Sequence, residues 1–237
     1  AISARGAKPG IEIVGVECAL YPSMWNALQG QSRPVGGATL AEGIAVKNVG
    51  KLTLPIIREL VSDVILVSES QLERAVNAYL TLQKTMAEGA GAAGLAAMLK
   101  EPERFKGRRV GLVLCGGNID PLLLAAIIER GMVRAGRLAR IRVAARDTPG
   151  VLARITALVA EAGANIDEVH HQRAFSTLSA QSVEAELVVQ TRNPAHVREV
   201  VAQVVHSVGL PRRLDAVEGL ARRPVADHVE VHLEALG

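Results

Sequence analysis

The sequence predicts an α/β protein with two parts, a parallel-sheet region followed by a smaller ferredoxin-like region. In the first part, short β-branched runs alternate with helical patterns, which is typical of a parallel sheet with helical crossovers. In the second part, an alternating strand is followed by a helix, two strands and a helix, which is the start of a split βαβ unit. Apolar residues make up 49% of the chain, so both parts can bury a core.

The predicted strands of the first part are β-branched and nearly continuous in apolar character, as expected for strands buried on both faces. They lie at 11–20, 64–69 and 109–115. Ser68 with Gln71 three residues later forms a capping-box pattern, which predicts a helix start. An alanine- and glycine-rich helix is predicted over about 89–99.

A further helix is expected after Asp120, which acts as the N-cap, with Pro121 at the first helical position. Residues 132–140 have no strong period and are interpreted as a linker. We therefore assign residues 1–134 to the first domain.

The second domain is predicted to span 139–217. It begins with an alternating strand at 139–147, and its two helices start at proline residues and end at glycine residues. The other strands are expected at 165–175 and 182–191. The closing strand could lie near 211–217 or within 226–235, so the tail at 218–237 could supply an extra strand.

Composition excludes several function classes. Aromatic residues make up 2% of the chain and the net charge is +3, so no base-stacking surface and no phosphate-binding stripe is indicated. No apolar run reaches about 18 residues, which argues against a membrane span. Cys18 and Cys115 lack the spacing of a disulfide framework or a zinc site. We expect a soluble, cytoplasmic protein with no nucleic-acid or membrane partner.

The stretch GLVLCGGNID, residues 111–120, places Gly116 and Gly117 at the end of a predicted strand. In open α/β sheets, ligands bind at the carboxyl ends of strands. Without side chains at these positions, backbone N–H groups can meet a ligand, and the next helix N-terminus favours an anion. A plain tight turn between strand and helix is the alternative.

Three segments of the sequence favour a ligand site at these glycines over a plain tight turn. TLAEGIAVKNVGKLTLPIIRELVSDVILVSESQLERA, EGAGAAGLAAMLK and VGLVLCGGNID, in this order, closely resemble the C-terminal half of the catalytic domain of the threonine dehydratase family. These are fold-type-II pyridoxal-phosphate enzymes related to serine racemase, and the resemblance covers about residues 1–131. It implies that Cys115 faces the pyridine nitrogen of the cofactor, which suits β-elimination. It also implies cofactor or substrate contacts for Gly116, Gly117, Asn118, Gly43 and Glu88.

The same resemblance places Glu17 where serine racemase has a carboxylate that binds a divalent cation. The second carboxylate of that site corresponds to Ser23 here. Because a hard cation requires several oxygen ligands, this loss argues against a metal, for which Glu17 is the remaining candidate.

Enzymes of this family need a lysine that forms a Schiff base with the cofactor, in a Ser-Phe-Lys-x-Arg-type motif upstream of a glycine-rich phosphate loop. Neither motif occurs in this sequence, and none of its six lysines has that context. We expect the chain to hold one wall of the active site and to be catalytically incomplete alone.

The stretch RDTPGVLARITALVAEAGANIDEVHHQRAF closely resembles an ACT domain, a small amino-acid-binding regulatory module. The resemblance implies that the turn at 147–152 binds the ligand and that the second strand contributes across a dimer interface. Gly150 allows close approach, and the helix N-terminus favours a carboxylate. The implied ligand residues are Asp147, Thr148, Pro149, Gly150, Val151, Leu152, Asn165 and Ile166. A homodimer or homotetramer is expected.

Two functions follow. The first is a threonine dehydratase that converts threonine or serine to a 2-oxo acid and ammonia, with allosteric regulation by an end product such as isoleucine or valine, as in isoleucine biosynthesis. The second is a truncated regulatory chain that senses an amino acid without catalysis. The absence of the lysine motif favours the second for the chain as it stands, whereas its resemblance favours the first as its origin.

Overall fold

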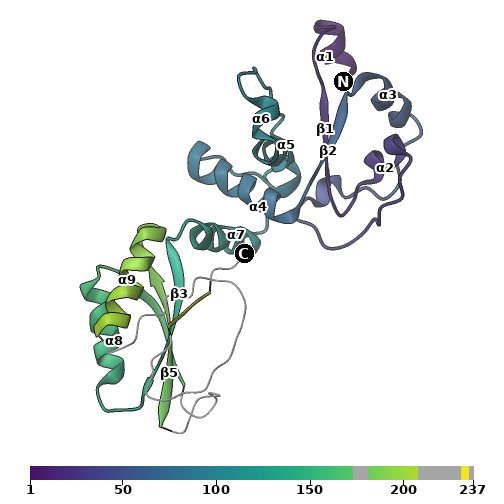
Figure 1. Cartoon of the computed structure of the whole chain (residues 1–237). Helices are drawn as coiled ribbons and strands as arrows, with labels where there is room; N and C mark the ends of the chain where they lie inside the picture. Colours follow the sequence, from purple (N-terminus) through teal and green to yellow (C-terminus); the bar gives the residue numbers. More distant parts are fainter. Residues whose placement is uncertain (173–180, 208–230, 235–237) are drawn as a thin grey trace. The chain divides into compact units, whose positions relative to one another are not determined.

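The structure is a computed structural model that describes residues 1–172, 181–207 and 231–234. It divides into two compact units, Ala1–Ile128 and Glu129–Gly237, each with its own hydrophobic core (Figure 1). In the described part of the chain, no helix is both long and apolar enough to cross a bilayer.

The first unit contains a parallel pair of strands, β1 (Val14–Cys18) and β2 (Asp63–Val67), aligned from Val14 opposite Asp63 to Cys18 opposite Val67. Helices and non-helical loops connect the two strands and follow β2. The helices of this unit are α1 (Ile2–Ala7), α2 (Ser23–Gln29), η1 (Glu42–Ile44), α3 (Thr53–Leu60), α4 (Glu69–Ala78), η2 (Tyr79–Gln83), α5 (Gly89–Lys100), α6 (Pro102–Phe105) and the start of α7 (Pro121–Arg134).

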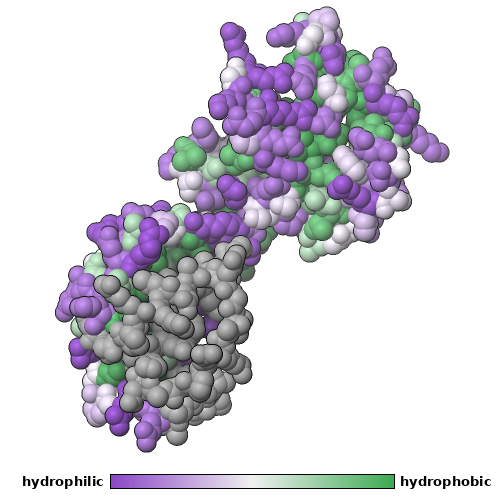
Figure 2. Space-filling view, viewed as in Figure 1, coloured by the Kyte–Doolittle hydropathy of each residue, from purple (hydrophilic) through white to green (hydrophobic). Residues whose placement is uncertain are grey.

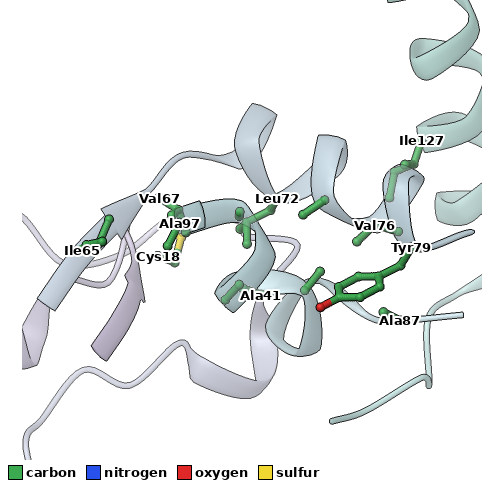
Figure 3. Packing of buried hydrophobic residues seen from close by; sticks show 14 residues of the cluster. Cys18, Ala41, Ile65, Val67, Leu72, Val76, Tyr79, Ala87, Ala97 and Ile127 are labelled. Atoms are coloured by element: carbon green, nitrogen blue, oxygen red, sulfur yellow. The ribbon is translucent and has the colours of Figure 1, made fainter. Parts of the chain in front are cut away.

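Helix α4 begins where the capping pattern predicts. The Gln71 backbone N–H donates to Ser68 Oγ at 3.4 Å, and the Ser68 N–H donates to Gln71 Oε1 at 2.8 Å. At helical spacing along α4 and η2, the side chains of Leu72, Val76 and Tyr79 are buried in the core of the first unit (Figure 3). The reciprocal cap therefore fixes where this helix begins, and the spacing of its apolar residues sets the face that is buried.

The predicted strand at 109–115 is wrong: no strand is present between α6 and α7. A strand requires a hydrogen-bonded neighbour, and among the described residues the parallel sheet ends at β1 and β2. The segment nevertheless keeps its apolar composition, with Val113 81% exposed and Val110, Leu112 and Leu114 also exposed. Hydrophobic residues reach the surface of the first unit in the space-filling view (Figure 2).

The predicted linker at 132–140 is also wrong in part, because α7 continues to Arg134 and the next strand begins at Leu138. Gly136, with φ of +61°, ends the helix. The Gly136 N–H donates to Val133 O and the Arg137 N–H donates to Met132 O, which together form a Schellman motif. A glycine stop thus replaces most of the expected linker.

The second unit is a four-stranded antiparallel sheet with two helices. Its elements are β3 (Leu138–Arg146), α8 (Val151–Glu161), β4 (Asn165–Gln172), β5 (Ser182–Gln190), α9 (Pro194–Ser207) and β6 (Val231–Glu234). The strand order is β4-β5-β3-β6, so the last strand lies beside the first. This order confirms the predicted ferredoxin-like fold.

Strand β6 pairs with β3 from Arg140 opposite Glu234 to Val143 opposite Val231. One of the two segments proposed for the closing strand, 226–235, therefore contains a strand of this sheet. The other, 211–217, lies outside the described residues, as does the tail at 218–237 apart from β6.

A buried histidine joins the two helices of the second unit. His196, which is 2% exposed, accepts from the Arg192 N–H at Nδ1 over 3.1 Å, and its Nε2 lies 2.8 Å from the Ala162 carbonyl oxygen. Because a backbone N–H can only donate, Nδ1 is the acceptor and Nε2 carries the proton. The side chain of Asn193 caps α9 by accepting from the His196 N–H at 3.0 Å. The imidazole therefore connects the end of α8 to the start of α9.

Glu186 on β5 forms ion pairs with two arginines of the neighbouring strand. Arg142 Nε donates to Glu186 Oε2 at 2.6 Å, and Arg140 Nε lies 3.2 Å from Glu186 Oε1. The hydrogen bond from Arg142 and the nearby positive charges hold the pKa of Glu186 below its ordinary value of 4.5. Because the pKa is lower in the folded state, this stabilisation is present above the unfolded-state pKa and is lost as the pH falls through the folded-state pKa.

We therefore predict that Glu186→Gln makes the free energy of unfolding of the second unit less sensitive to pH between about pH 6 and pH 3. Urea denaturation followed by circular dichroism measures this slope. Glu184→Gln, on the same strand, should leave the slope unchanged. Equal slopes in Glu186→Gln and the unsubstituted protein would contradict the role given to the ion pairs.

Candidate functional site

Three segments of the first unit meet around the side chain of Glu88. Glu88 immediately precedes α5, and its carboxylate occupies the space where a side chain at Gly116 would lie. A methyl group on Gly43 would lie 3.4 Å from Glu88 Oε1 and 3.1 Å from Ala90 Cβ. We call Gly43, Glu88, Gly91 and residues 115–117 the glycine corner.

The backbone of residues 115–117 runs directly against the start of α5. The Glu88 N–H donates to the Gly116 carbonyl at 3.2 Å. A methyl group on Gly91 would overlap the Cys115 carbonyl, and one on Gly117 would lie 3.3 Å from the Met86 carbonyl. The structure thus brings together Gly43, Glu88, Cys115, Gly116 and Gly117, which lie far apart in the sequence.

The glycine corner is exposed at residues 115–117 and Gly43, whereas Gly91 within it is buried. Cys115 and Asn118 are exposed, as are the residues on either side of the two glycines. Gly116 adopts a φ of +83°, which favours glycine, and its missing side chain makes room for Glu88. The exposed thiol of Cys115, the backbone of Gly116 and Gly117 and the Glu88 carboxylate could together border a polar-edged ring such as that of pyridoxal phosphate.

Glu17 caps a helix. Its carboxylate oxygens accept from the Met24 and Trp25 N–H groups, each at 2.8 Å, at the start of α2. Burial raises the pKa of Glu17, and the two backbone donors oppose this shift. Ser23, at the position of the second expected ligand, donates its hydroxyl to the Val46 and Lys47 carbonyls. Within the described residues, no group of three His, Cys, Asp or Glu side chains could hold a metal ion.

The expected amino-acid site of the second unit forms a turn between β3 and α8. Gly150 has a φ of +87°, and among the described residues, apart from its chain neighbours, no atom lies within 4 Å of where its side chain would be. The Val151 N–H donates to the Thr148 carbonyl at 3.1 Å, and the Asp147 N–H donates to the Gln181 carbonyl at 2.8 Å. Backbone hydrogen bonds therefore help to hold this turn, and Gly150 supplies its left-handed conformation.

The apolar members of this expected site are only partly available. Val151, Leu152 and Ile166 are half-buried and pack against the core of the second unit. Asn165 is exposed at the start of β4, and Pro149 is exposed in the turn. The structure thus places Leu152 and Ile166 on the same core while leaving the polar residues near the surface.

A polar network next to the glycine corner had no signal in the sequence. Cys18, Thr39 and Glu69 come from the end of β1, the segment before η1 and the start of α4. No spacing rule connects three residues from separate segments, so only the fold could bring them together.

Two families match this chain. The pyridoxal-phosphate dependent enzyme family matches residues 1–116, and the ACT domain family matches residues 139–206. The chain joins a segment of the pyridoxal-phosphate dependent enzyme family to an ACT domain. The resemblances found in the sequence are confirmed, and the ACT match coincides with the ferredoxin-like sheet of the second unit.

Similar proteins include the L-threonine ammonia-lyase of Geobacter sulfurreducens, 40% identical over 206 residues that cover 86% of this chain and 51% of that protein. The L-threonine ammonia-lyase of Thermotoga maritima is 36% identical over 201 residues, covering 84% and 50%. The chain therefore spans about half the length of these two relatives. A maize serine racemase of known structure is 28% identical, covering 55% of this chain and 42% of that chain, with a TM-score of 0.48.

Proposed function

We propose that this chain belongs to a pyridoxal-phosphate-dependent ammonia-lyase that converts L-threonine or L-serine to a 2-oxo acid and ammonia. The observation that carries the proposal is the 40% identity to an L-threonine ammonia-lyase, which extends over 86% of this chain. The glycine corner supports it, because the residues implied as cofactor contacts meet at one open position of the first unit.

In this proposal, the glycine corner forms one wall of the cofactor site. When bound, pyridoxal phosphate supplies an electron sink for the bond that breaks at the substrate α-carbon. Cys115 would present its thiol to the ring nitrogen, and Gly116, Gly117 and Asn118 would border the ring. The backbone at Gly43 would border the same space, and the Glu88 carboxylate would lie close enough to cofactor and substrate to take part in proton transfer.

We also propose that none of the six lysines is the covalent anchor of the cofactor, so that this chain alone is catalytically incomplete. None lies in a Ser-Phe-Lys context. Three of them bond to groups outside the glycine corner: Lys84 donates to Thr81 O, Lys100 to Leu66 O, and Lys106 pairs with Glu103.

An NMR titration of the isotope-labelled chain with pyridoxal phosphate tests whether the glycine corner forms one wall of the cofactor site. We expect the amide signals of Gly43, Gly116, Gly117 and Asn118 to move, with no borohydride-stable adduct on a lysine and no ammonia released from L-threonine. Cys115→Ser should preserve these shifts, because the hydroxyl is also a neutral polar group, whereas Cys115→Ala should weaken them. Shifts confined to lysine-bearing surfaces, or a stable lysine adduct, would show that the wall or the missing anchor is assigned wrongly.

The ACT domain favours a second role, amino-acid sensing, either as regulation of the enzyme or as the only activity of this chain. The observations that support it are the ACT domain match over residues 139–206 and the left-handed turn at Gly150 just before α8. We expect millimolar isoleucine or valine to raise the thermal midpoint of the second unit, since a ligand at about 100 times its Kd stabilises the folded state by about 2.7 kcal/mol.

Asn165→Ala provides the matched variant for this experiment. Its side chain is exposed, so the substitution should change the unliganded midpoint little while reducing the ligand-induced increase. No change in midpoint with any proteinogenic amino acid would argue against a working sensor in this chain.

A further inference from the structure

Glu69, the first residue of α4, receives three donors from other segments. Its Oε1 accepts from the Thr39 hydroxyl at 2.7 Å and from the Cys18 thiol at 3.1 Å. Its Oε2 accepts from the Leu40 N–H at 2.7 Å. Thr39 Oγ1 in turn accepts from the Ala41 N–H at 3.1 Å. One carboxylate thus fixes the backbone of residues 39–41.

Residues 39–41 lie between this carboxylate and the glycine corner. A methyl group on Gly89, the first residue of α5, would overlap the Leu40 carbonyl, so the two backbones are in direct contact. Ala41 is fully buried in the core that also contains Cys18 and Val67, the last residues of β1 and β2 (Figure 3). Two residues further along, Gly43 packs against Glu88 and Ala90.

We propose that Glu69 is a positioning residue for the glycine corner: by fixing residues 39–41 it holds Gly43 against Glu88 and Ala90. The relevance of this role to a cofactor rests on the proposed function, whereas the contact itself does not. The donors to the Glu69 carboxylate are Cys18, Thr39 and Leu40, so its effect on the glycine corner is transmitted through the backbone of residues 39–43.

A carboxylate suits this position better than an amide. Both oxygens of Glu69 accept, whereas the amide nitrogen of a glutamine would face a donor on one side. Burial raises the pKa of Cys18, and its contact with Glu69 acts in the same direction, so the thiol keeps its proton and can donate. The Thr39 hydroxyl can rotate to accept from an amide, which is why Glu69→Gln should keep part of the network.

The rate at which a thiol reagent modifies Cys18 measures, without any cofactor, whether the hydrogen bonds among Cys18, Thr39 and Glu69 are intact. Cys18 is fully buried, whereas Cys115, the other cysteine, is exposed, so the experiment uses a Cys115→Ser background. We expect Glu69→Ala to increase the rate of Cys18 modification by a thiol reagent by about tenfold or more, the scale of a lost hydrogen bond to a charged group. Glu69→Gln should give an intermediate rate, and Glu59→Ala, an exposed glutamate of α3, the parent rate.

Amide NMR separates positioning from a general loss of stability. In Glu69→Ala we expect the signals of Leu40, Gly43 and Glu88 to move and exchange faster, with Val16 and Ile65 in the β1–β2 ladder unchanged. Partial recovery in Glu69→Gln supports the positioning role. Protected Cys18 in Glu69→Ala, or ladder amides that exchange faster to the same degree as Gly43, would overturn it.

The titration with pyridoxal phosphate distinguishes this inference from the proposed function. If the cofactor shifts Gly43 in the parent protein and the shift is reduced in Glu69→Ala, both are supported. If the cofactor shifts nothing in the parent protein, the proposed function fails, while the thiol and exchange measurements still decide the role of Glu69.

Discussion

Gly91→Ala should lower the free energy of unfolding of the first unit by about 3 kcal/mol, near the upper end for overpacking of a tight contact. The added methyl group would overlap the Cys115 carbonyl and come within 3.0 Å of the Gly116 carbonyl. Both are backbone atoms, so no side chain can rotate away to relieve the contact. Helix α5 and residues 115–117 must move apart instead, which disrupts the packing of the glycine corner.

Gly94→Ala is the matched control, because it adds the same methyl group one turn later in the same helix. Its nearest neighbour would be Leu112 Cδ2 at 3.5 Å, an ordinary van der Waals distance. Alanine is favoured over glycine inside a helix by about 0.8–1 kcal/mol, so this substitution should be neutral or stabilising.

Denaturant unfolding followed by the fluorescence of Trp25 measures both variants, since this is the one tryptophan of the sequence and lies in the first unit. Gly91→Ala should lower the free energy of unfolding, whereas Gly94→Ala should leave it unchanged or raise it. Similar effects at Gly91 and Gly94 would show that the contact of α5 with residues 115–117 is not tight.

His196→Ala should destabilise the second unit by about 3 kcal/mol, since a buried polar group that loses its partner costs about 1–3 kcal/mol and two are affected here. The substitution leaves the Arg192 N–H and the Ala162 carbonyl without the imidazole between them. It also removes a fully enclosed ring and leaves a cavity between α8 and α9.

His206→Ala on the same helix removes an exposed imidazole and should change the free energy of unfolding by less than about 0.5 kcal/mol. Circular dichroism follows the loss of the second unit, while Trp25 fluorescence shows whether the first unit is unaffected. A loss of less than about 1 kcal/mol in His196→Ala would mean that water replaces the imidazole at both backbone groups.

Local signals in the sequence predicted most elements of the fold. The capping pair Ser68 and Gln71, and the N-cap Asp120, whose Oδ1 accepts from the Leu123 N–H, sit at helix starts as expected. The conformation of residues 109–115 was beyond such signals, because an apolar β-branched run does not specify which strand will pair with it. The helix end at Gly136, a Schellman motif, lies inside the segment predicted as a linker.

The candidate site also has some features that local sequence signals predict and others that depend on the fold. The positions of Cys115, Gly116 and Glu88 in their motifs predicted a common site, and the fold brings them together. The function of the gap at Gly116 was not predictable, since the carboxylate that fills it comes from a residue 28 positions earlier. The role of Glu69 likewise depends on contacts among three separate segments.

The way in which Glu88 fills the empty side-chain volume at position 116 has an evolutionary consequence. The side chains at positions 88 and 116 occupy the same space, so a substitution at one position constrains the other. A homologue with a larger residue at 116 must have a shorter residue at 88 or a different backbone path at that position. Residues 88 and 116 should therefore covary in a sufficiently diverse alignment of homologues.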